Sequence, residues 1–381
     1  MTQAQEELIM IIRNVACEYA LPDGFSIIDP DELYQLAKAH DIAHFVGYAV
    51  DKRRISVADE GIRKAFRQQY FKATRRVIIL ENEIKNIRDV FENSGIDFIL
   101  LKGAVIRKLY SADWMRVSGD IDILVRADEL DRAEQVLVKR LNYSVTSEGA
   151  HHDHVTAPSG FHVDLHFTLT EREGQAKPFL EDVWNRCSVV EGKKHEYQMD
   201  DEMFYLFHMF HTAIHFQLGG CGMRPVLDTW LLNHRIEFDQ EKRRILLQQT
   251  GLMQFAETME KLAEEWFSGV DASGIEDVER YIFTGGLYGG TQRIAAAQAQ
   301  NSSRFGYLIK RAFPPISTMK IVGYPIVEKW KVLLPFCWIH RLIRGFMQGK
   351  GKLVPYEFQK TKEETGRSME ISELFMKLGL Q

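Results

Sequence analysis

The stretch that decides the fold is Gly119-Asp120-Ile121-Asp122-Ile123-Leu124-Val125. Two aspartates alternate with isoleucines before the run becomes fully apolar, which is typical of a strand with one packed face. Residues two apart in a strand point to the same face, roughly 6.5–7 Å apart along the chain, so Asp120 and Asp122 share one surface. Like charges this close favour a cation between them, and Mg²⁺ takes carboxylate and phosphate oxygens. The stretch therefore predicts a strand that carries a metal site.

A shorter apolar run precedes this strand. Ile96-Asp97-Phe98-Ile99-Leu100-Leu101 has the length of a strand and is closed by Lys102-Gly103. Residues 104–110 then read as a helix and residues 111–119 as a loop. The free N–H groups at the start of a helix favour phosphate, and glycine permits close approach to the backbone. We therefore expect phosphate to bind at Lys102-Gly103.

Further strands follow an amphipathic helix over residues 128–141. The segments 143–146, 154–156 and 162–167 are predicted as strands, antiparallel across tight turns. Asp164 lies on the last of them. If that strand neighbours the one with the two aspartates, Asp164 completes a three-carboxylate cluster, which two-metal phosphoryl chemistry requires.

Helical patterns flank this core on both sides. We expect an α+β fold, with a small mixed β-sheet core between N-terminal and C-terminal helical segments. The predicted parts are an N-terminal helical segment (1–93), an α/β core (94–200), a helical domain (201–300), and a basic C-terminal helical segment with a tail (301–381). Within the first part, the apolar helix stripe is assigned to Ile78, Ile79, Ile84, Ile87 and Val90.

The segment 301–352 is strongly basic. It holds ten Lys and Arg residues and one acid, Glu328, in a chain of net charge −5. Such a block can meet phosphates, a polyanion or an anionic membrane surface, or can dock on an acidic part of the same chain. The interleaved aromatic residues fit peripheral membrane contact or the core of a terminal helical unit, with short helices broken by turns over 313–352; they are Trp330, Phe336, Trp338 and Phe346. There is no strong nucleic-acid signal.

Length and composition indicate a folded protein of two or three domains. The chain has 381 residues, of which 45% are apolar and 27% charged, and this excludes a disordered chain. No run approaches the ~18 apolar residues of a membrane-spanning helix. Glu6, Glu7 and Arg13 do not fit a secretory signal. With four cysteines and no C-x-x-C pair, we expect a cytoplasmic protein.

Several of these motifs occur together in one known group of proteins. They are Leu100-Leu101-Lys102-Gly103, Arg116, the stretch 119–125 and Val163-Asp164-Leu165-His166. In this combination the chain resembles the uncharacterised nucleotidyltransferase family of the polymerase-β-like superfamily. The similarity continues through residues 206–228 and 324–335, and so spans most of the chain from about residue 94.

The resemblance implies a fold and a reaction. The expected enzyme is Mg²⁺-dependent, with Mn²⁺ as an alternative, and moves a nucleoside monophosphate from a nucleoside triphosphate (NTP) to an acceptor hydroxyl with release of pyrophosphate. Asp120 and Asp122 would hold the metal, and Asp164 would be the third acid and assist deprotonation. The acceptor is unknown. A small molecule or a saccharide fits, because family members are often associated with bacterial surface-polysaccharide gene clusters.

The resemblance also assigns binding residues. Lys102 and Gly103 would cradle the triphosphate, and Arg116 would reach a phosphate with its fork of donors. Strand alternation, and not the resemblance, places His166 on the same face as Asp164 and His162, where it would orient a carboxylate or contact the substrate. One position departs from the superfamily's usual Gly-Ser pair, because Ala104 follows Gly103 and offers no hydroxyl. Lys102 is expected to compensate as a phosphate contact.

Two alternative functions stay open. Ala104 is compatible with a catalytically silent nucleotide-binding or scaffold protein. Metal-dependent glycosyltransferases also use Asp-x-Asp, although the helical segment before the motif disfavours that class. His208, His211 and His215 lie along one predicted helix face, where they either form a soft-metal site or line a cleft as hydrogen-bonded histidines.

Overall fold

The computed structural model describes residues 1–147, 151–170, 174–286, 330, 333–338, 340 and 370–380. The chain divides into two compact units. The first takes Met1–Phe216, Gly220–Tyr288 and Leu378–Leu380 and contains the sheet, and the second takes Gln217–Gly219, Gly289–Lys377 and Gln381. The predictions for the basic segment 301–352 lie outside the described residues, apart from positions 330, 333–338 and 340.

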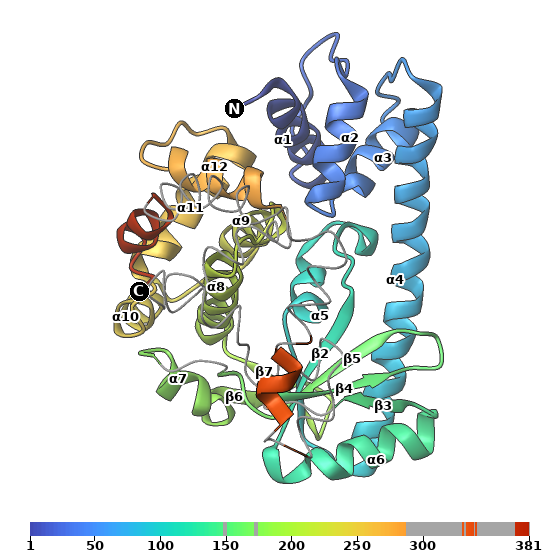
Figure 1. Cartoon of the computed structure of the whole chain (residues 1–381), viewed down its shortest axis with the longest axis vertical. Helices are drawn as coiled ribbons and strands as arrows, with labels where there is room; N and C mark the ends of the chain where they lie inside the picture. Colours follow the sequence, from blue (N-terminus) through green and yellow to red (C-terminus); the bar gives the residue numbers. More distant parts are fainter. Residues whose placement is uncertain are drawn as a thin grey trace. The chain divides into compact units, whose positions relative to one another are not determined.

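The first unit contains a seven-stranded mixed sheet, in the order β3-β4-β5-β2-β1-β7-β6 (Figure 1). The predicted α+β class is therefore confirmed. The strands are β1 (Phe98–Leu100), β2 (Asp120–Val125), β3 (Ser144–Ser147), β4 (His152–Thr156), β5 (His162–His166), β6 (Cys187–Val189) and β7 (Glu196–Met199).

The central pairings decide which side chains meet. β1 runs antiparallel to β2, β2 runs parallel to β5, and β5 runs antiparallel to β4. The predicted tight turn between β4 and β5 is present. Gly160 there has φ +81°, a conformation that favours glycine, and its N–H donates to the carbonyl of Ala157 at 2.8 Å. β5 is thus placed between β2 and β4, and polar residues from all three strands share one face.

The opposite face of the sheet is covered by α4 (Glu60–Ser94) and α6 (Leu130–Leu141), which pack on Ile121, Ile123 and Val163 (Figure 1). Along α4, the buried stripe includes Val77, Leu80, Ile84, Ile87 and Phe91. Ile78 is 59% exposed, so its assignment to the stripe was wrong. α4 ends at Gly95, whose left-handed φ of +65° turns the chain into β1.

The structure departs from the sequence prediction in two places. The helix expected over residues 104–110 is only α5 (Gly103–Ile106), followed by a 3₁₀ turn (Arg107–Leu109). β6 and β7 were not predicted, because strands of three or four residues carry too little alternation to be recognised.

The remaining helices lie before and after the sheet in the chain, except α7, which lies between β5 and β6. They are α1 (Gln3–Ala16), α2 (Pro30–Ala39), α3 (Ala43–Lys52), α7 (Lys177–Glu181), α8 (Asp201–Gln217), α9 (Arg224–Arg235), α10 (Gln240–Gln249), α11 (Met253–Ser268) and α12 (Glu276–Gly285). Among the described residues, no helix combines the length and the apolar character that crossing a membrane requires. The division at residues 93, 200 and 300 stays a proposal.

Candidate active site

Carboxylates from two adjacent strands face each other at the centre of the sheet. In the parallel pair of β2 and β5, Asp122 lies opposite Asp164 and Asp120 lies opposite His162. The ligand atoms of Asp122, Asp164 and His166 all lie within 4.8 Å of one another. The condition set by the sequence, that the strand of Asp164 neighbours the strand of the two aspartates, is met.

Asp122 is buried between two basic partners. Lys102 Nζ donates to Asp122 Oδ1 at 2.7 Å, and His166 Nε2 donates to the same oxygen at 2.8 Å. Burial alone would raise the pKa of Asp122, but the charge of Lys102 and the contact with His166 outweigh it and hold that pKa well below its usual range. Asp122 is therefore ionised at neutral pH, as a carboxylate must be to bind a divalent cation.

Asp120 stands at the exposed start of β2. Desolvation and then the charge of Asp122 raise its pKa; Lys102 opposes this, and Asp164 adds a smaller upward effect. In the part of the chain that the structure describes, Asp120 does not join the carboxylate group within 4.8 Å. The three acids expected to form one cluster are thus a close pair, Asp122 and Asp164, with Asp120 at the edge and near enough to repel them.

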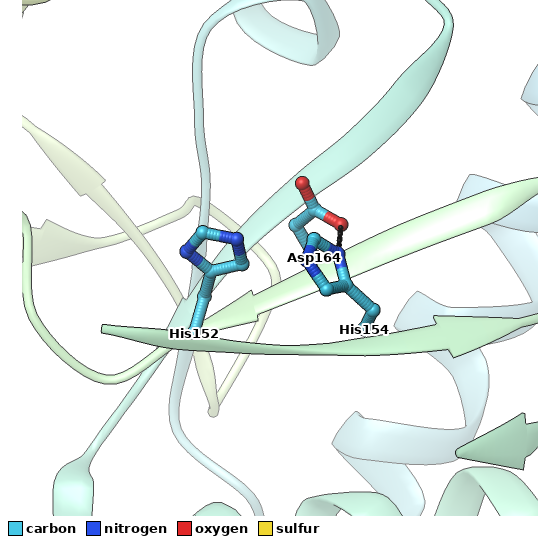
Figure 2. A group of neighbouring side chains, drawn as sticks. All are labelled: His152, His154 and Asp164. Carbon is cyan, nitrogen blue, oxygen red and sulfur yellow. Dashed lines mark hydrogen bonds and ion pairs between the residues drawn. The ribbon is translucent and has the colours of Figure 1, made fainter. Parts of the chain in front are cut away.

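Asp164 has an imidazole partner of its own. His154 lies opposite it in the antiparallel pair of β4 and β5, and His154 Nδ1 donates to Asp164 Oδ1 at 2.7 Å (Figure 2). His152 lies two residues earlier on β4, with its ring centroid 4.6 Å from that of His154. The sequence showed only that histidines crowd this hairpin. Their contact with Asp164 depends on strand register, which no local pattern specifies.

The turn after β1 is strained. Lys102 has φ +44° and ψ −118°, a conformation that favours glycine and costs about 1–3 kcal/mol in another residue. The turn brings Lys102 Nζ to Asp122. Since α5 has only four residues, its dipole contributes little, and the expected attraction for phosphate depends mainly on the charge of Lys102.

Gly103 makes room for a hydroxyl group. A Cβ at this position would clash with Ser118 Oγ and would lie 3.5 Å from Arg116 Nη1. Ser118 belongs to the loop that leads into β2. The hydroxyl that Ala104 does not offer is therefore present beside Gly103, supplied by a different segment. Sequence reasoning missed Ser118, because it looked for serine next to the glycine.

Arg116 has a buried partner on α9. Its Nε donates to both oxygens of Asp228, at 3.0 and 3.1 Å, and the hydroxyl of Tyr110 donates to Asp228 at 2.7 Å. Burial would lower the pKa of Arg116, but the charge of Asp228 outweighs it and the pKa is raised. The guanidinium expected to reach a phosphate thus stays charged, with one edge held by Asp228 and Nη1 near Gly103.

An arginine on α4 fixes the loop before the carboxylates. Arg76 Nε donates to the carbonyl of Ser118, and Arg76 Nη2 donates to the carbonyl of Gly119, both at 2.8 Å. These two residues come directly before Asp120. Arg76 therefore holds in place the loop that presents Ser118 and leads into β2.

The three histidines of α8 do not act together. His208 is buried, and its Nε2 lies 3.1 Å from Thr229 Oγ1. His211 and His215 have their Nε2 atoms 2.9 Å apart. Within the described residues, these side chains form no group of three metal ligands. The reading of His208 as a hydrogen-bonded histidine is the one that its contact supports.

A small pocket lies beside the partners of Asp122. Lys102, His166 and His211 form its polar part, and its apolar part comes from Leu169 and three residues of α8; the α8 residues are Phe207, Phe210 and Ile214. Burial lowers the pKa of His211 well below its usual value, and Lys102 adds to this effect, so the imidazole is neutral at pH 7. The pocket has room for about one water molecule, so it marks a polar spot beside Lys102 and His166 and not a substrate cavity.

Comparison with known proteins gives one match. Residues 26–268 match the family model described as "Uncharacterised nucleotidyltransferase". No curated protein and no solved structure matches the chain. The matched region holds the whole sheet and extends to the end of α11, and its family supports nucleotidyl transfer, with a nucleoside triphosphate as substrate, as the general reaction. The chain belongs to this uncharacterised nucleotidyltransferase family.

Proposed function

We propose that the protein is a Mg²⁺-dependent nucleotidyltransferase, with Mn²⁺ as an alternative ion. It transfers a nucleoside monophosphate from an NTP to an acceptor hydroxyl. The acceptor oxygen bonds to the α-phosphorus, the bond from that phosphorus to the bridging oxygen breaks, and pyrophosphate leaves. The observation that carries the proposal is the pair Asp122 and Asp164, facing each other across adjacent strands beside the Lys102-Gly103 turn.

The donor set fits a divalent cation. Asp122 is ionised, and its ligand atoms lie within 4.8 Å of those of Asp164 and His166. Asp122 and Asp164 would hold the ion, with Asp120 contributing from the edge. A bound ion offsets charge on the phosphate oxygens and makes the acceptor hydroxyl a better nucleophile.

The triphosphate is assigned to the turn after β1. Gly103 permits close approach of the backbone, and Lys102 supplies a positive charge. Ser118 offers a hydroxyl and Arg116 offers its Nη1 at the same place. These groups position the phosphates and balance the charge on the leaving pyrophosphate, and positioning with electrostatic stabilisation is most of what phosphoryl transfer needs.

The acceptor hydroxyl is assigned to the side of the metal site where Asp164 lies. Asp164 accepts the proton of the acceptor hydroxyl, and its hydrogen bond from His154 fixes the carboxylate for this role. The proposed acceptor is the one that the sequence predicts, a small molecule or a saccharide.

The test has a binding part and a product part. Each of the four NTPs is titrated calorimetrically into the protein with Mg²⁺, and mixtures of α-phosphorus-labelled NTP with candidate acceptors are analysed for products. We expect pyrophosphate and a labelled acceptor. Asp122→Asn should abolish turnover, while Asp97→Asn, at the residue directly before β1, should leave it nearly unchanged.

Three outcomes would contradict the proposal. Free nucleoside diphosphate from sugar nucleotides would indicate glycosyl transfer instead. NTP binding without turnover across the acceptor panel would indicate a silent nucleotide-binding protein. Full activity of Asp122→Asn would remove the assigned metal site.

A further inference from the structure

We propose that His152, His154 and Asp164 bind a transition-metal ion such as Zn²⁺, Mn²⁺ or Co²⁺. We call these three residues the His-His-Asp group. The proposal rests on their geometry and not on the nucleotidyl-transfer chemistry. It adds to the Mg²⁺ site a second site with different donor atoms, and the two sites share Asp164.

The sheet brings the three side chains together. On β4, His152 and His154 are two residues apart and therefore point to one face, and β5 presents Asp164 on the same face, directly opposite His154 (Figure 2). One ligand atom from each lies within 4.8 Å of the others. Rigid strands are better supports for a metal site than loops, because neighbouring strands fix the separation of the ligands.

The distances are close to those of a bound metal. With bonds of about 2.0–2.2 Å, ligand atoms around a tetrahedral ion stand roughly 3.3 Å apart. The ligand atoms of the His-His-Asp group would have to approach by at most about 1.5 Å, which side-chain rotation allows. His154 Nδ1 already lies 2.7 Å from Asp164 Oδ1, so those two residues need to move apart slightly to admit an ion between them.

The donor atoms select the class of metal. Two imidazoles and one carboxylate suit Zn²⁺, Mn²⁺, Fe²⁺ and Co²⁺, whereas Mg²⁺ and Ca²⁺ prefer oxygen ligands alone. All three side chains are half-buried, so an ion can reach them and the remaining coordination positions stay accessible to water or substrate. Three protein ligands with open positions are typical of catalytic rather than structural metal sites.

The neighbouring residues support a cation here. Asp120 and Asp122 lie on the next strand, and Asp122 faces Asp164. The ring of His166 lies 4.7 Å from that of His152, centroid to centroid. An ion bound by the His-His-Asp group would sit close to the Mg²⁺ site and would reduce the repulsion that Asp164 exerts on the other carboxylates.

Co²⁺ is the probe, because its visible absorption reports ligand type and number. We expect the full-length protein to bind one Co²⁺ in excess Mg²⁺, with absorption typical of nitrogen ligands. His154→Ala and His152→Ala should each weaken binding by about 100-fold, as expected for loss of a direct ligand. His162→Ala is the matched control: it lies on β5 beside Asp164, is exposed, and should bind Co²⁺ like the wild type.

A second measurement uses only the wild-type protein, so it is valid even if the variants do not fold. In the proton NMR spectrum of the Co²⁺-loaded wild type, the ion strongly shifts the exchangeable N–H resonance of each histidine that it coordinates. The number of shifted resonances therefore gives the number of coordinated histidines. The His-His-Asp group predicts two. A single shifted resonance would indicate the Asp122, Asp164 and His166 group instead, and would overturn the proposal.

Two further results would also overturn it. One is the absence of Co²⁺ and Zn²⁺ binding in excess Mg²⁺, and the other is equal loss of binding in His154→Ala and His162→Ala. Asp122→Asn separates the two proposals: it should retain Co²⁺ binding even though it abolishes turnover. If the wild type binds Co²⁺ as expected but transfers no nucleotide, only the proposed function fails.

Discussion

Two groups of side chains in the first unit combine the same residue types. In the first, Asp122 accepts hydrogen bonds from Lys102 and His166. In the second, Asp97 accepts hydrogen bonds from Arg126 Nε and His195 Nδ1, both at 2.9 Å. We call these two sets the Asp122 cluster and the Asp97 cluster. Each joins an aspartate, a histidine and a permanent cation.

Both aspartates also have a lowered pKa. At Asp97, as at Asp122, burial raises the pKa but the basic partners outweigh it. A lowered pKa beside a histidine therefore does not identify a catalytic site, since structural ion pairs produce the same shift.

The two clusters differ in the carboxylates around them. Close to Asp97, the acids have local donors. Glu129 accepts from the N–H of Asp97 and from Arg132, and Glu92 accepts from the backbone N–H groups of residues 194–196. Arg126 also packs over the ring of Trp184 at 4.3 Å.

Beside Asp122 lie two more acids, Asp120 and Asp164, and the pKa of Asp120 is raised rather than lowered. The Asp122 cluster thus has more negative charge than its partners balance. That excess of negative charge, and not the residue types, favours a cation beside Asp122.

The largest effect should appear in activity. We expect Asp122→Asn to lower turnover by about a thousandfold, or about 4 kcal/mol of transition-state stabilisation. Asp97→Asn should stay within about threefold of the wild type. Pyrophosphate release at saturating NTP measures both. Equal losses of turnover in the two variants would show that the Asp122 cluster is no more important for catalysis than the Asp97 cluster.

The second-largest difference between the two clusters should be the effect of Mg²⁺ on thermal stability. An ion that binds only the folded state at ten times its dissociation constant adds about 1.4 kcal/mol, or about 3 °C in the melting temperature. We expect this Mg²⁺-dependent shift in the wild type and in Asp97→Asn, but not in Asp122→Asn. Thermal unfolding with and without Mg²⁺ measures it. If the Mg²⁺-dependent shift in melting temperature is still present in Asp122→Asn, the ion binds at a different site.

Acid should reveal the structural role of Asp97. Its pKa is lower in the folded state than in the unfolded chain, so its contribution is fully present above the unfolded value of about 3.9 and is lost as the pH falls further. Between pH 6 and pH 3, the wild type should lose about 1 kcal/mol more stability than Asp97→Asn, whose residue 97 does not titrate. Urea unfolding at the two pH values measures the difference. Parallel losses would mean that the ion pairs of Asp97 contribute nothing.

The smallest expected effect is at Asp120, where substitution should stabilise the folded protein. The raised pKa of Asp120 means that its ionised form destabilises the folded protein at neutral pH, so stability at this residue is gained as the pH falls. Without metal, Asp120→Asn should raise the melting temperature because it removes this repulsion. The rise should be only about 1 °C, since exposure to solvent weakens the repulsion. The variant should still lower turnover. A variant that is both more stable and less active cannot owe its defect to unfolding. A lower melting temperature would contradict the assigned repulsion.

The sequence predicted most of the strands at the centre of the sheet. Alternation predicted the strand with Asp120 and Asp122 and the strand with Asp164, and a glycine-containing turn predicted the antiparallel pair of β4 and β5. These signals are local, because each depends on residues a few positions apart.

The remainder depends on contacts between distant segments. The sequence did not specify that β5 lies next to β2. It also did not specify the register of β4 against β5, so the contact of His154 with Asp164 was not predicted. The ion pair of Arg116 with Asp228 joins residues 112 positions apart. The expected phosphate contact of Arg116 and the metal roles of the acids stay predictions until they are measured.

The bare backbone at Gly103 has a consequence for how such proteins are recognised. Its missing side chain leaves space for the hydroxyl of Ser118, which comes from a different segment of the chain. A methyl group at position 103 would force that hydroxyl to move, so the two positions should vary together among relatives. A search that requires glycine followed directly by serine would discard chains in which the serine has moved to the facing loop.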